Sequence, residues 1–214
     1  MEPRCLRLAI LASGRGSNFL AIRDAINKGA LNAQISVLIS DKANAPALEK
    51  AEQSGIPGVF IDPRVYPDRQ AYESEIVRQL ETREIDLIVL AGYMRLVGSV
   101  LLHAYPHKML NIHPALLPSF TGLHAQRQAV DYGVKYSGCT VHFVDEGMDT
   151  GAIIDQVVVP LYHDDTEDDL AERILVEEHK IYVKVLQWIA EGRVYIEGRQ
   201  VFVDHSSEFK EVAK

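Results

Sequence analysis

Hydrophobic residues along this chain follow two alternating patterns: short apolar runs, and apolar positions at helical spacing. Continuous apolar runs suit strands that are buried on both faces of a sheet. We expect strands at residues 6–12, 34–40, 59–61, 85–90, 108–112, 138–144 and 153–159. Helical spacing between the first four runs predicts helices that end near Gly29 and that span residues 46–54 and 68–84. The alternation predicts an α/β fold, a mostly parallel twisted sheet flanked by helices on both faces.

A long amphipathic helix is expected after Thr166, whose side chain can cap its first turn. Its apolar stripe consists of Leu170, Ile174, Ile181, Val185 and Trp188. Glu178 falls on the same stripe, and a buried carboxylate is costly unless it has a partner. We therefore expect Glu178 to bind a functional partner. The alternative is a wide stripe from which the carboxylate reaches solvent.

The length of 214 residues fits a single domain, which we place over residues 1–214. Its N-terminal half covers about residues 1–100 and its C-terminal half about residues 101–203. A hairpin formed by residues 194–196 and 200–203 closes the second half, and a polar tail follows at 204–214.

The composition and charge of the chain limit which partners and which cellular compartment are expected. The net charge is −8 and no run of Lys or Arg stands out, so we expect no nucleic-acid partner. No stretch approaches the roughly 20 apolar residues of a transmembrane helix, and no signal peptide is evident, so we expect no membrane association. Cys5 and Cys139 lie in apolar segments, where we expect both to be buried. Without a disulfide framework, the sequence predicts a reduced, cytoplasmic protein.

A glycine-rich segment at residues 13–18 separates the first strand from the first helix. Glycines let the backbone approach a ligand, and the amides of a helix N-terminus favour an anion. A Walker loop is excluded, because no Lys follows the second glycine. A dinucleotide fingerprint matches only in part: Asp41 lies roughly where a ribose-binding acid would, but Phe19 stands where that motif needs a small residue. We favour a cradle for a single phosphate over a plain tight turn. The cradle consists of Gly16, Ser17 and Asn18.

A second candidate site lies where the fifth strand ends, at Asn111 and His113. Residues two apart in a strand point to the same face, so this amide and this imidazole are expected side by side. Pro114 ends the strand because it cannot donate a ladder hydrogen bond. Open α/β sheets bind ligands at such strand ends. The alternative is that both are ordinary turn residues.

Two loops follow other strands. Taken alone, residues 91–97 suggest a helix start that packs Met94 and Leu96 into the core. Residues 145–151 carry three carboxylates between two strands, which fits either a binding loop or an ordinary acidic hairpin.

A metal site is not expected. His103 and His107 have the spacing of metal ligands on a helix, but Pro106 breaks the helical register between them. No third ligand is evident in the sequence.

Taken together, these segments resemble the phosphoribosylglycinamide formyltransferases (GAR transformylases), a branch of the folate-dependent formyltransferases. The resemblance covers roughly residues 7–203. It rests on the motifs ASGRGSN, LAGYMRLV, LNIHPALLPSF, GCTVHFVDEGMDTGAII and EEHKIY. It implies a Rossmann-like formyltransferase fold. It also implies transfer of a formyl group from the co-substrate 10-formyltetrahydrofolate to the amine of glycinamide ribonucleotide, in purine biosynthesis.

The resemblance also assigns roles to residues. The catalytic residues it implies are Asn111, His113 and Asp149. The residues it implies for the ribonucleotide are Gly16, Ser17, Asn18 and Glu178. The residues it implies for the folate are Arg69, Met94, Arg95, Leu96, Val97, Asn111, Asp145, Glu146, Gly147, Met148 and Asp149. The N-terminal half would hold the phosphate of the ribonucleotide, and the C-terminal half would hold the folate and the catalytic residues.

The sequence departs from the family in places. Leu175 stands where some relatives carry a Lys near the phosphate, and the role of Arg15 is open. Val183 replaces a Pro that is common after the EHxIY segment, which would affect only the shape of the helix.

Other functions compete with this one. The nearest rival is a formyltetrahydrofolate deformylase, which passes the formyl group to water. A methionyl-tRNA formyltransferase, a non-catalytic nucleotide-binding module and an NAD-dependent dehydrogenase are weaker rivals, and a homodimer is left open.

Overall fold

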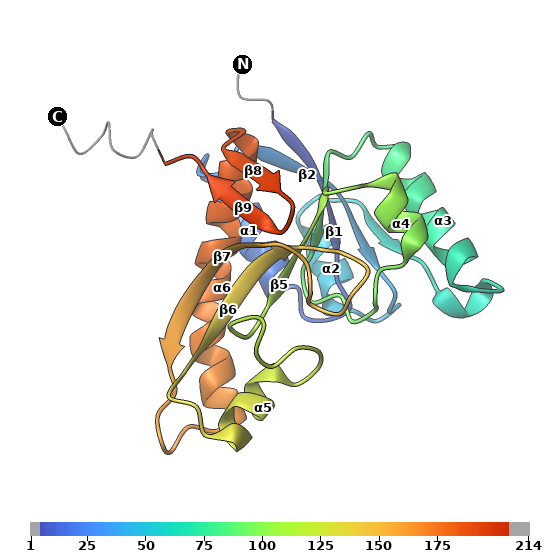
Figure 1. Ribbon diagram of the computed structural model, residues 1–214. Coiled ribbons are helices and arrows are strands. Elements are labelled where there is room, and N and C mark those ends of the chain that lie inside the picture. Colours follow the sequence, from blue (N-terminus) through green and yellow to red (C-terminus); the bar gives the residue numbers. More distant parts are fainter. Residues whose placement is uncertain (1–4, 206–214) are drawn as a thin grey trace.

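The computed structural model describes residues 5–205. Seven strands form one sheet in the order β3-β2-β1-β4-β5-β6-β7 (Figure 1). Their bounds are β1 (Leu6–Leu11), β2 (Ala33–Ser40), β3 (Gly58–Phe60), β4 (Leu87–Leu90), β5 (Met109–His113), β6 (Tyr136–Phe143) and β7 (Ile153–Pro160). Strands β1 to β5 pair in parallel, whereas β6 and β7 run antiparallel to their neighbours. The predicted mostly parallel α/β fold is confirmed.

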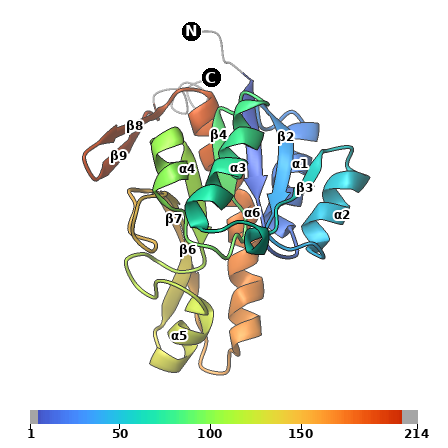
Figure 2. The same ribbon diagram turned by 90° about the vertical axis from the view of Figure 1, so that its right-hand side faces the viewer.

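Helices cover both faces of the sheet, and the alternation of buried side chains along β1 shows why. Leu8 and Ile10 belong to a core that includes side chains of α1, α2, α5 and α6, whereas Ala9 and Leu11 belong to one that includes side chains of α3 and α4. Figure 2 shows α3 and α4 in front of the sheet, with α6 behind it. The helices are α1 (Ser17–Asn27), α2 (Pro46–Gln53), α3 (Arg69–Glu81), α4 (Ser99–Ala104), α5 (Ala125–Tyr132) and α6 (Glu167–Ala190), with a 3₁₀ turn η1 (Pro63–Val65).

Helix α6 begins where its sequence indicates. The side chain of Thr166 accepts a hydrogen bond from the Asp169 amide, and the Asp169 carboxylate accepts one from the Thr166 amide, a reciprocal capping box. The predicted apolar stripe is buried. Tyr182, fully buried on the same helix, directs its hydroxyl at the carbonyls of Leu90 (2.9 Å) and Leu110 (3.1 Å). These contacts fix α6 against the end of β4 and the first half of β5.

The structure corrects two expectations. Cys139 is buried as expected, but Cys5 is exposed because it precedes β1. Met94 and Leu96 do not pack into the core: they are 65% and 55% exposed, and α4 begins only after them.

The last two predicted strands form the expected hairpin, β8 (Val194–Glu197) with β9 (Gln200–Val203). Most of the predicted polar tail lies outside the described residues.

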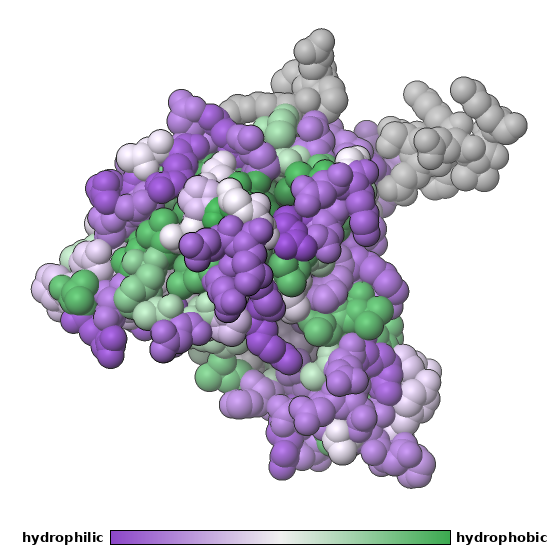
Figure 3. Space-filling model, turned by 180° about the vertical axis from the view of Figure 1, so that it is seen from behind, coloured by the Kyte–Doolittle hydropathy of each residue, from purple (hydrophilic) through white to green (hydrophobic). Residues whose placement is uncertain are grey.

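The described surface is mixed in character. Figure 3 shows the rear face, where hydrophilic side chains interrupt the apolar areas. Within residues 5–205, no helix is both long enough and apolar enough to cross a membrane.

Candidate active site

The predicted site residues gather where parallel strands end. The chain runs from β1 outward to β2 and β3, then returns to place β4 and β5 on the other side of β1. Such a reversal leaves a crevice at the carboxyl ends of the strands, where open α/β sheets bind ligands. The loops that follow β1 and β4 meet there. The Ser13 hydroxyl donates to Asp41 Oδ1 (2.6 Å) and accepts from the Met94 amide (2.9 Å).

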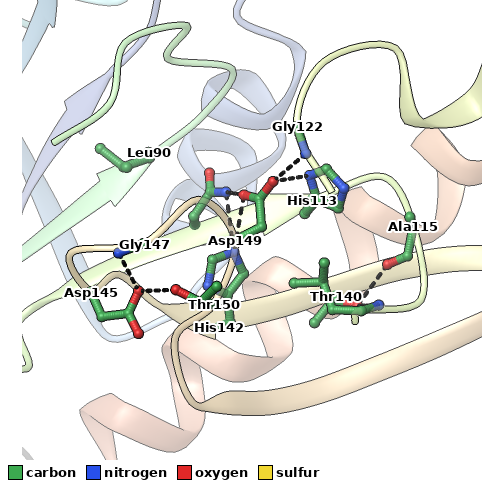
Figure 4. Close-up of polar contacts among 12 residues, drawn as sticks. Leu90, His113, Ala115, Gly122, Thr140, His142, Asp145, Gly147, Asp149 and Thr150 are labelled. Carbon is green, nitrogen blue, oxygen red and sulfur yellow. Dashed lines mark hydrogen bonds and ion pairs between the residues drawn. The ribbon is translucent and has the colours of Figure 1, made fainter. Parts of the chain in front are cut away.

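Asn111, His113 and Asp149 converge at the end of β5. Figure 4 shows His113 and Asp149 facing each other. Asn111 Nδ2 lies 3.5 Å from Asp149 Oδ1, and His113 Nδ1 lies 3.4 Å from Asp149 Oδ2. Asp149 comes from the loop between β6 and β7 and adopts a left-handed backbone conformation, with φ of 55°. A non-glycine residue in that region is strained, and such strain concentrates at functional sites.

The His113 ring is held at both of its nitrogens. It is 4% exposed, and Nε2 lies 2.8 Å from the carbonyl oxygen of Phe120, which can only accept a hydrogen bond. Nε2 therefore carries a hydrogen, and Nδ1 faces the Asp149 carboxylate. Both ring nitrogens therefore face hydrogen-bond acceptors, the Phe120 carbonyl and the Asp149 carboxylate.

A loop at residues 120–124, to which sequence reasoning assigned no role in the site, completes this contact set. Besides the Phe120 carbonyl, it supplies the Gly122 amide, which donates to Asp149 Oδ2 at 2.8 Å. Phe120, Gly122 and His124 all have positive φ values, of 54°, 80° and 58°. The glycine hinted at a turn, but the contacts come from backbone groups, which every residue possesses.

His142 is a second residue that sequence reasoning missed. It pairs with Asn111 across the antiparallel β5–β6 register. His142 Nδ1 lies 2.8 Å from the Phe143 carbonyl, so Nδ1 donates and Nε2 is left to accept from Asn111 Nδ2 at 3.2 Å. Burial lowers the pKa of His142, which favours this neutral form. His142 thus orients the Asn111 amide. Only the strand register, which sequence does not provide, could have shown it.

The loop before Asp149 is shaped by its own side chains. Asp145 Oδ1 accepts from the Thr150 hydroxyl (2.7 Å) and from the Gly147 amide (3.1 Å) (Figure 4). Gly151 is required, because a Cβ there would lie 1.7 Å from the Phe143 carbonyl oxygen. Met148, predicted to bind the folate, is 48% exposed on this loop.

The predicted folate residues after β4 form a contact set with the start of α3. Arg69 Nη2 donates to the Leu96 carbonyl at 2.6 Å, and Arg69 Nε donates to Glu73 at 3.0 Å. Glu73 is 3% exposed and also accepts from the amide of Gly98 (2.6 Å), where α4 begins. Sequence reasoning missed Glu73, which sits beneath residues 94–98 as a structural support. Arg95 lies over the Tyr72 ring, 5.3 Å from its centroid.

The glycine loop forms an open helix N-terminus. Gly16 has φ of 72°, and a Cβ there would lie 2.9 Å from Ala47 Cβ, so a glycine is needed. Helix α1 has no side-chain cap, which leaves its first amides available to an anion. Phe19, which stands where a dinucleotide loop has a small residue, is fully buried in the core. Lys50 Nζ donates to the Arg15 carbonyl at 2.6 Å, so an ammonium group lies beside the loop.

Glu178 reaches this loop from α6. Its Oε2 accepts from Asn18 Nδ2 at 2.9 Å, so the chain itself supplies a partner for the buried carboxylate. Burial raises the pKa of Glu178, and the Asn18 hydrogen bond opposes that effect. Asn18 is 7% exposed, and within the described residues its buried Oδ1 has no hydrogen-bond partner. Buried polar atoms are normally satisfied, so this oxygen is free to accept from a ligand.

Helix α4 ends at Ala104, so His103 and His107 do not share a helix. Among residues 5–205, no group of three or more His, Cys, Asp or Glu side chains could hold a metal ion.

Comparison with known proteins identifies the family of this chain. The formyl transferase family model matches residues 6–186. The chain belongs to the formyl transferase family. A phosphoribosylglycinamide formyltransferase of Bacillus subtilis is 45% identical over 85% of this chain and 93% of its own length. The glycinamide ribonucleotide transformylase 1 structure from Symbiobacterium toebii is 47% identical, with a TM-score of 0.93 and 95% of each chain covered.

Two other formyl transferase relatives show the limits of the match. A trifunctional purine biosynthetic protein of Drosophila melanogaster is 42% identical over 92% of this chain, but the match spans 15% of that protein. A formyltetrahydrofolate deformylase structure from Pseudomonas syringae is 28% identical, with a TM-score of 0.86, covering 94% of this chain and 66% of that one. The similarity is thus greater to the glycinamide ribonucleotide branch, as the sequence motifs predicted.

Proposed function

We propose that this protein transfers a formyl group from 10-formyltetrahydrofolate to the amine of glycinamide ribonucleotide, a step of purine biosynthesis. The observation that carries the proposal is the convergence of Asn111 and His113 on Asp149 at the end of β5. Similarity to phosphoribosylglycinamide formyltransferases along most of the chain supports the same conclusion.

The reaction needs hydrogen-bond donors and a route for a proton. When the amine attacks the formyl carbon, the carbonyl oxygen becomes an oxyanion. Donors placed where that charge develops contribute about 3–4 kcal/mol each. We assign this role to Asn111 Nδ2 and His113 Nδ1, whose contacts with Asp149 are long enough, at 3.5 and 3.4 Å, to be exchanged for a substrate oxygen. The amine then loses a proton and the folate nitrogen gains one, and His113 with Asp149 can mediate that transfer.

The ribonucleotide is proposed to bind at two points. The phosphate lies on the amides at the start of α1, next to Gly16, Ser17 and Asn18, with the Lys50 ammonium beside the loop. Glu178 accepts hydrogen bonds from the amine or the ribose, because a carboxylate buried from water needs such donors beside its contact with Asn18. Binding at both ends holds the amine near the formyl group, and this positioning speeds the reaction because less entropy is lost in reaching the transition state.

The folate is proposed to lie along residues 94–97, with Arg69 and the loop at residues 145–149. The support is that Met94 and Leu96 are exposed just after β4 ends and that Met148 is exposed on the loop between β6 and β7. Exposed apolar side chains of this kind suit a flat aromatic ligand.

A single domain, with the ribonucleotide-phosphate half at about residues 1–100 and the catalytic and folate half at about residues 101–203, remains part of this proposal. The division is not strict, because Arg69 and residues 94–97 of the first half are assigned to the folate and Glu178 of the second half is assigned to the ribonucleotide. A cytoplasmic enzyme that acts on small molecules, without nucleic-acid or membrane partners, is also part of this proposal. A net charge of −8 without a Lys/Arg run is the support for excluding nucleic acid. A homodimer stays open.

One assay separates this function from its rivals. Purified protein is incubated with 10-formyltetrahydrofolate, with and without glycinamide ribonucleotide, and both formylated ribonucleotide and free formate are measured. Formylated ribonucleotide is expected only when the acceptor is present. Formate release independent of the acceptor would identify a deformylase, and no turnover with retained binding would identify a non-catalytic module.

A further inference from the structure

The hairpin β8–β9 contacts the loop that carries Asp149. Strand β9 lies beside β7 (Figure 1), and residues Gly198 and Arg199 form the two-residue turn of the hairpin. Gly198 has φ of 60°, as the first position of a type II′ turn requires. From this turn, Arg199 Nη1 donates to the carbonyl oxygen of Thr150 at 2.8 Å.

This contact acts on the residue next to Asp149. The Thr150 side chain is already bound to Asp145, and its carbonyl is bound by Arg199, so the residue is held from inside and from outside the loop. Gly151 then passes tightly against Phe143 and fixes the end of the loop. The backbone of Asp149 is strained, with φ of 55°, so its conformation depends on the contacts of the residues around it.

The hairpin is a firm support for such a contact. Four of its side chains alternate inward and pack against the larger core, while the intervening ones face solvent. The inward residues are Val194, Ile196, Val201 and Val203. An arginine in the turn is therefore presented from an anchored element, although its own hydrogen bond is exposed.

We propose that Arg199 is a positioning residue: by binding the Thr150 carbonyl, it holds Asp149 in the conformation that directs the carboxylate at His113 and Gly122. The kinetic part of this inference rests on the proposed formyl transfer. Because the contact is exposed, its effect is modest, and we expect a loss of about three- to tenfold in the single-turnover rate when it is removed.

The test compares wild type with Arg199→Ala, Arg199→Lys and two controls. Glu197→Gln changes an exposed residue of the same hairpin. Arg83→Ala removes another arginine that donates to a backbone carbonyl, that of Gln79, on α3. Two quantities are measured: the single-turnover rate at saturating substrates, and hydrogen exchange at the Gly122 amide, which donates to Asp149.

Arg199→Ala is expected to slow turnover and to speed exchange at Gly122, with an unchanged melting temperature. Arg199→Lys should restore part of both, and the two controls should match wild type. An unchanged rate and unchanged Gly122 exchange in Arg199→Ala would overturn the inference, as would faster exchange across the whole core. If wild type itself transfers no formyl group, the proposed function fails, but the exchange comparison still decides the role of Arg199.

Discussion

Replacing Asp149 with Asn tests whether the carboxylate itself supports the chemistry. Both of its oxygens face donors. Oδ2 accepts from the Gly122 amide at 2.8 Å and faces His113 Nδ1 at 3.4 Å, while Oδ1 accepts from Asn111 Nδ2 at 3.5 Å. An asparagine must turn its NH₂ group toward one of these two sides. In either orientation donors face each other, and the negative charge beside the His113 ring is lost.

The size of the effect follows from these contacts. A buried donor without an acceptor costs about 1–3 kcal/mol, and each 1.4 kcal/mol or so changes a rate tenfold. Misplacing Asn111 or His113 therefore lowers the rate by about 5- to 150-fold if the cost falls on the transition state. Loss of a group that supports proton transfer adds a factor of about 10² or more. We expect Asp149→Asn to slow the chemical step by at least about 10²-fold.

The measurement is a rapid-quench single turnover at saturating substrates, with ribonucleotide binding measured separately by calorimetry. Ribonucleotide affinity should stay near that of wild type, because the proposed phosphate loop does not contact Asp149. Asp131→Asn is the matched control, because that exposed residue of α5 bonds only to Arg127, at 3.1 Å, among the contacts described. A single-turnover rate equal to that of wild type would refute the role assigned to Asp149.

Four further outcomes are expected. His113→Ala should lower the single-turnover rate by about 10²-fold or more without weakening ribonucleotide binding, and near-normal turnover would contradict its role. Glu178→Gln should raise the Michaelis constant for the ribonucleotide and not that for the folate; because burial raises the pKa of Glu178, removing the charge should not lower the melting temperature at neutral pH. Burial lowers the pKa of His142, so the unfolded chain protonates this imidazole more readily than the folded one does. The free energy of unfolding should therefore fall as the pH drops below about 6.5, and His142→Gln should flatten that part of the plot of unfolding free energy against pH. Tyr182→Phe should lower the melting temperature by about 2–4 °C through loss of the hydroxyl contacts, and calorimetry checks this.

The elements that sequence predicted well are those set by local periodicity. The stripe of α6 and its Thr166 cap follow from spacing and from the hydrogen-bonding capacity of Thr and Asp. The shared direction of Asn111 and His113 follows from the two-residue repeat of a strand. Neither inference needed to know which strands are neighbours.

The parts that sequence could not predict depend on which strands and loops lie next to each other in the fold. His142 meets Asn111 only because β6 runs antiparallel to β5 in one particular register. The contacts from Phe120 and Gly122 use the backbone, which carries no residue-specific signal. Met94 and Leu96 were expected in the core because an apolar residue usually is, but the segment between β4 and α4 leaves both exposed, as the proposed folate site would require.

Ser13 shows how the two proposed substrate sites share one support. It opens the glycine loop, its amide donates to the Gly92 carbonyl at 3.0 Å, and its hydroxyl accepts from the Met94 amide at 2.9 Å. The buried Asp41 accepts from that hydroxyl and fixes its orientation. The phosphate loop and the start of the folate segment are therefore bound to each other as well as to the paired strands β1 and β4. For a reaction between two bound molecules, such a fixed separation matters more than affinity for either one, because the rate depends on the amine meeting the formyl carbon in one geometry.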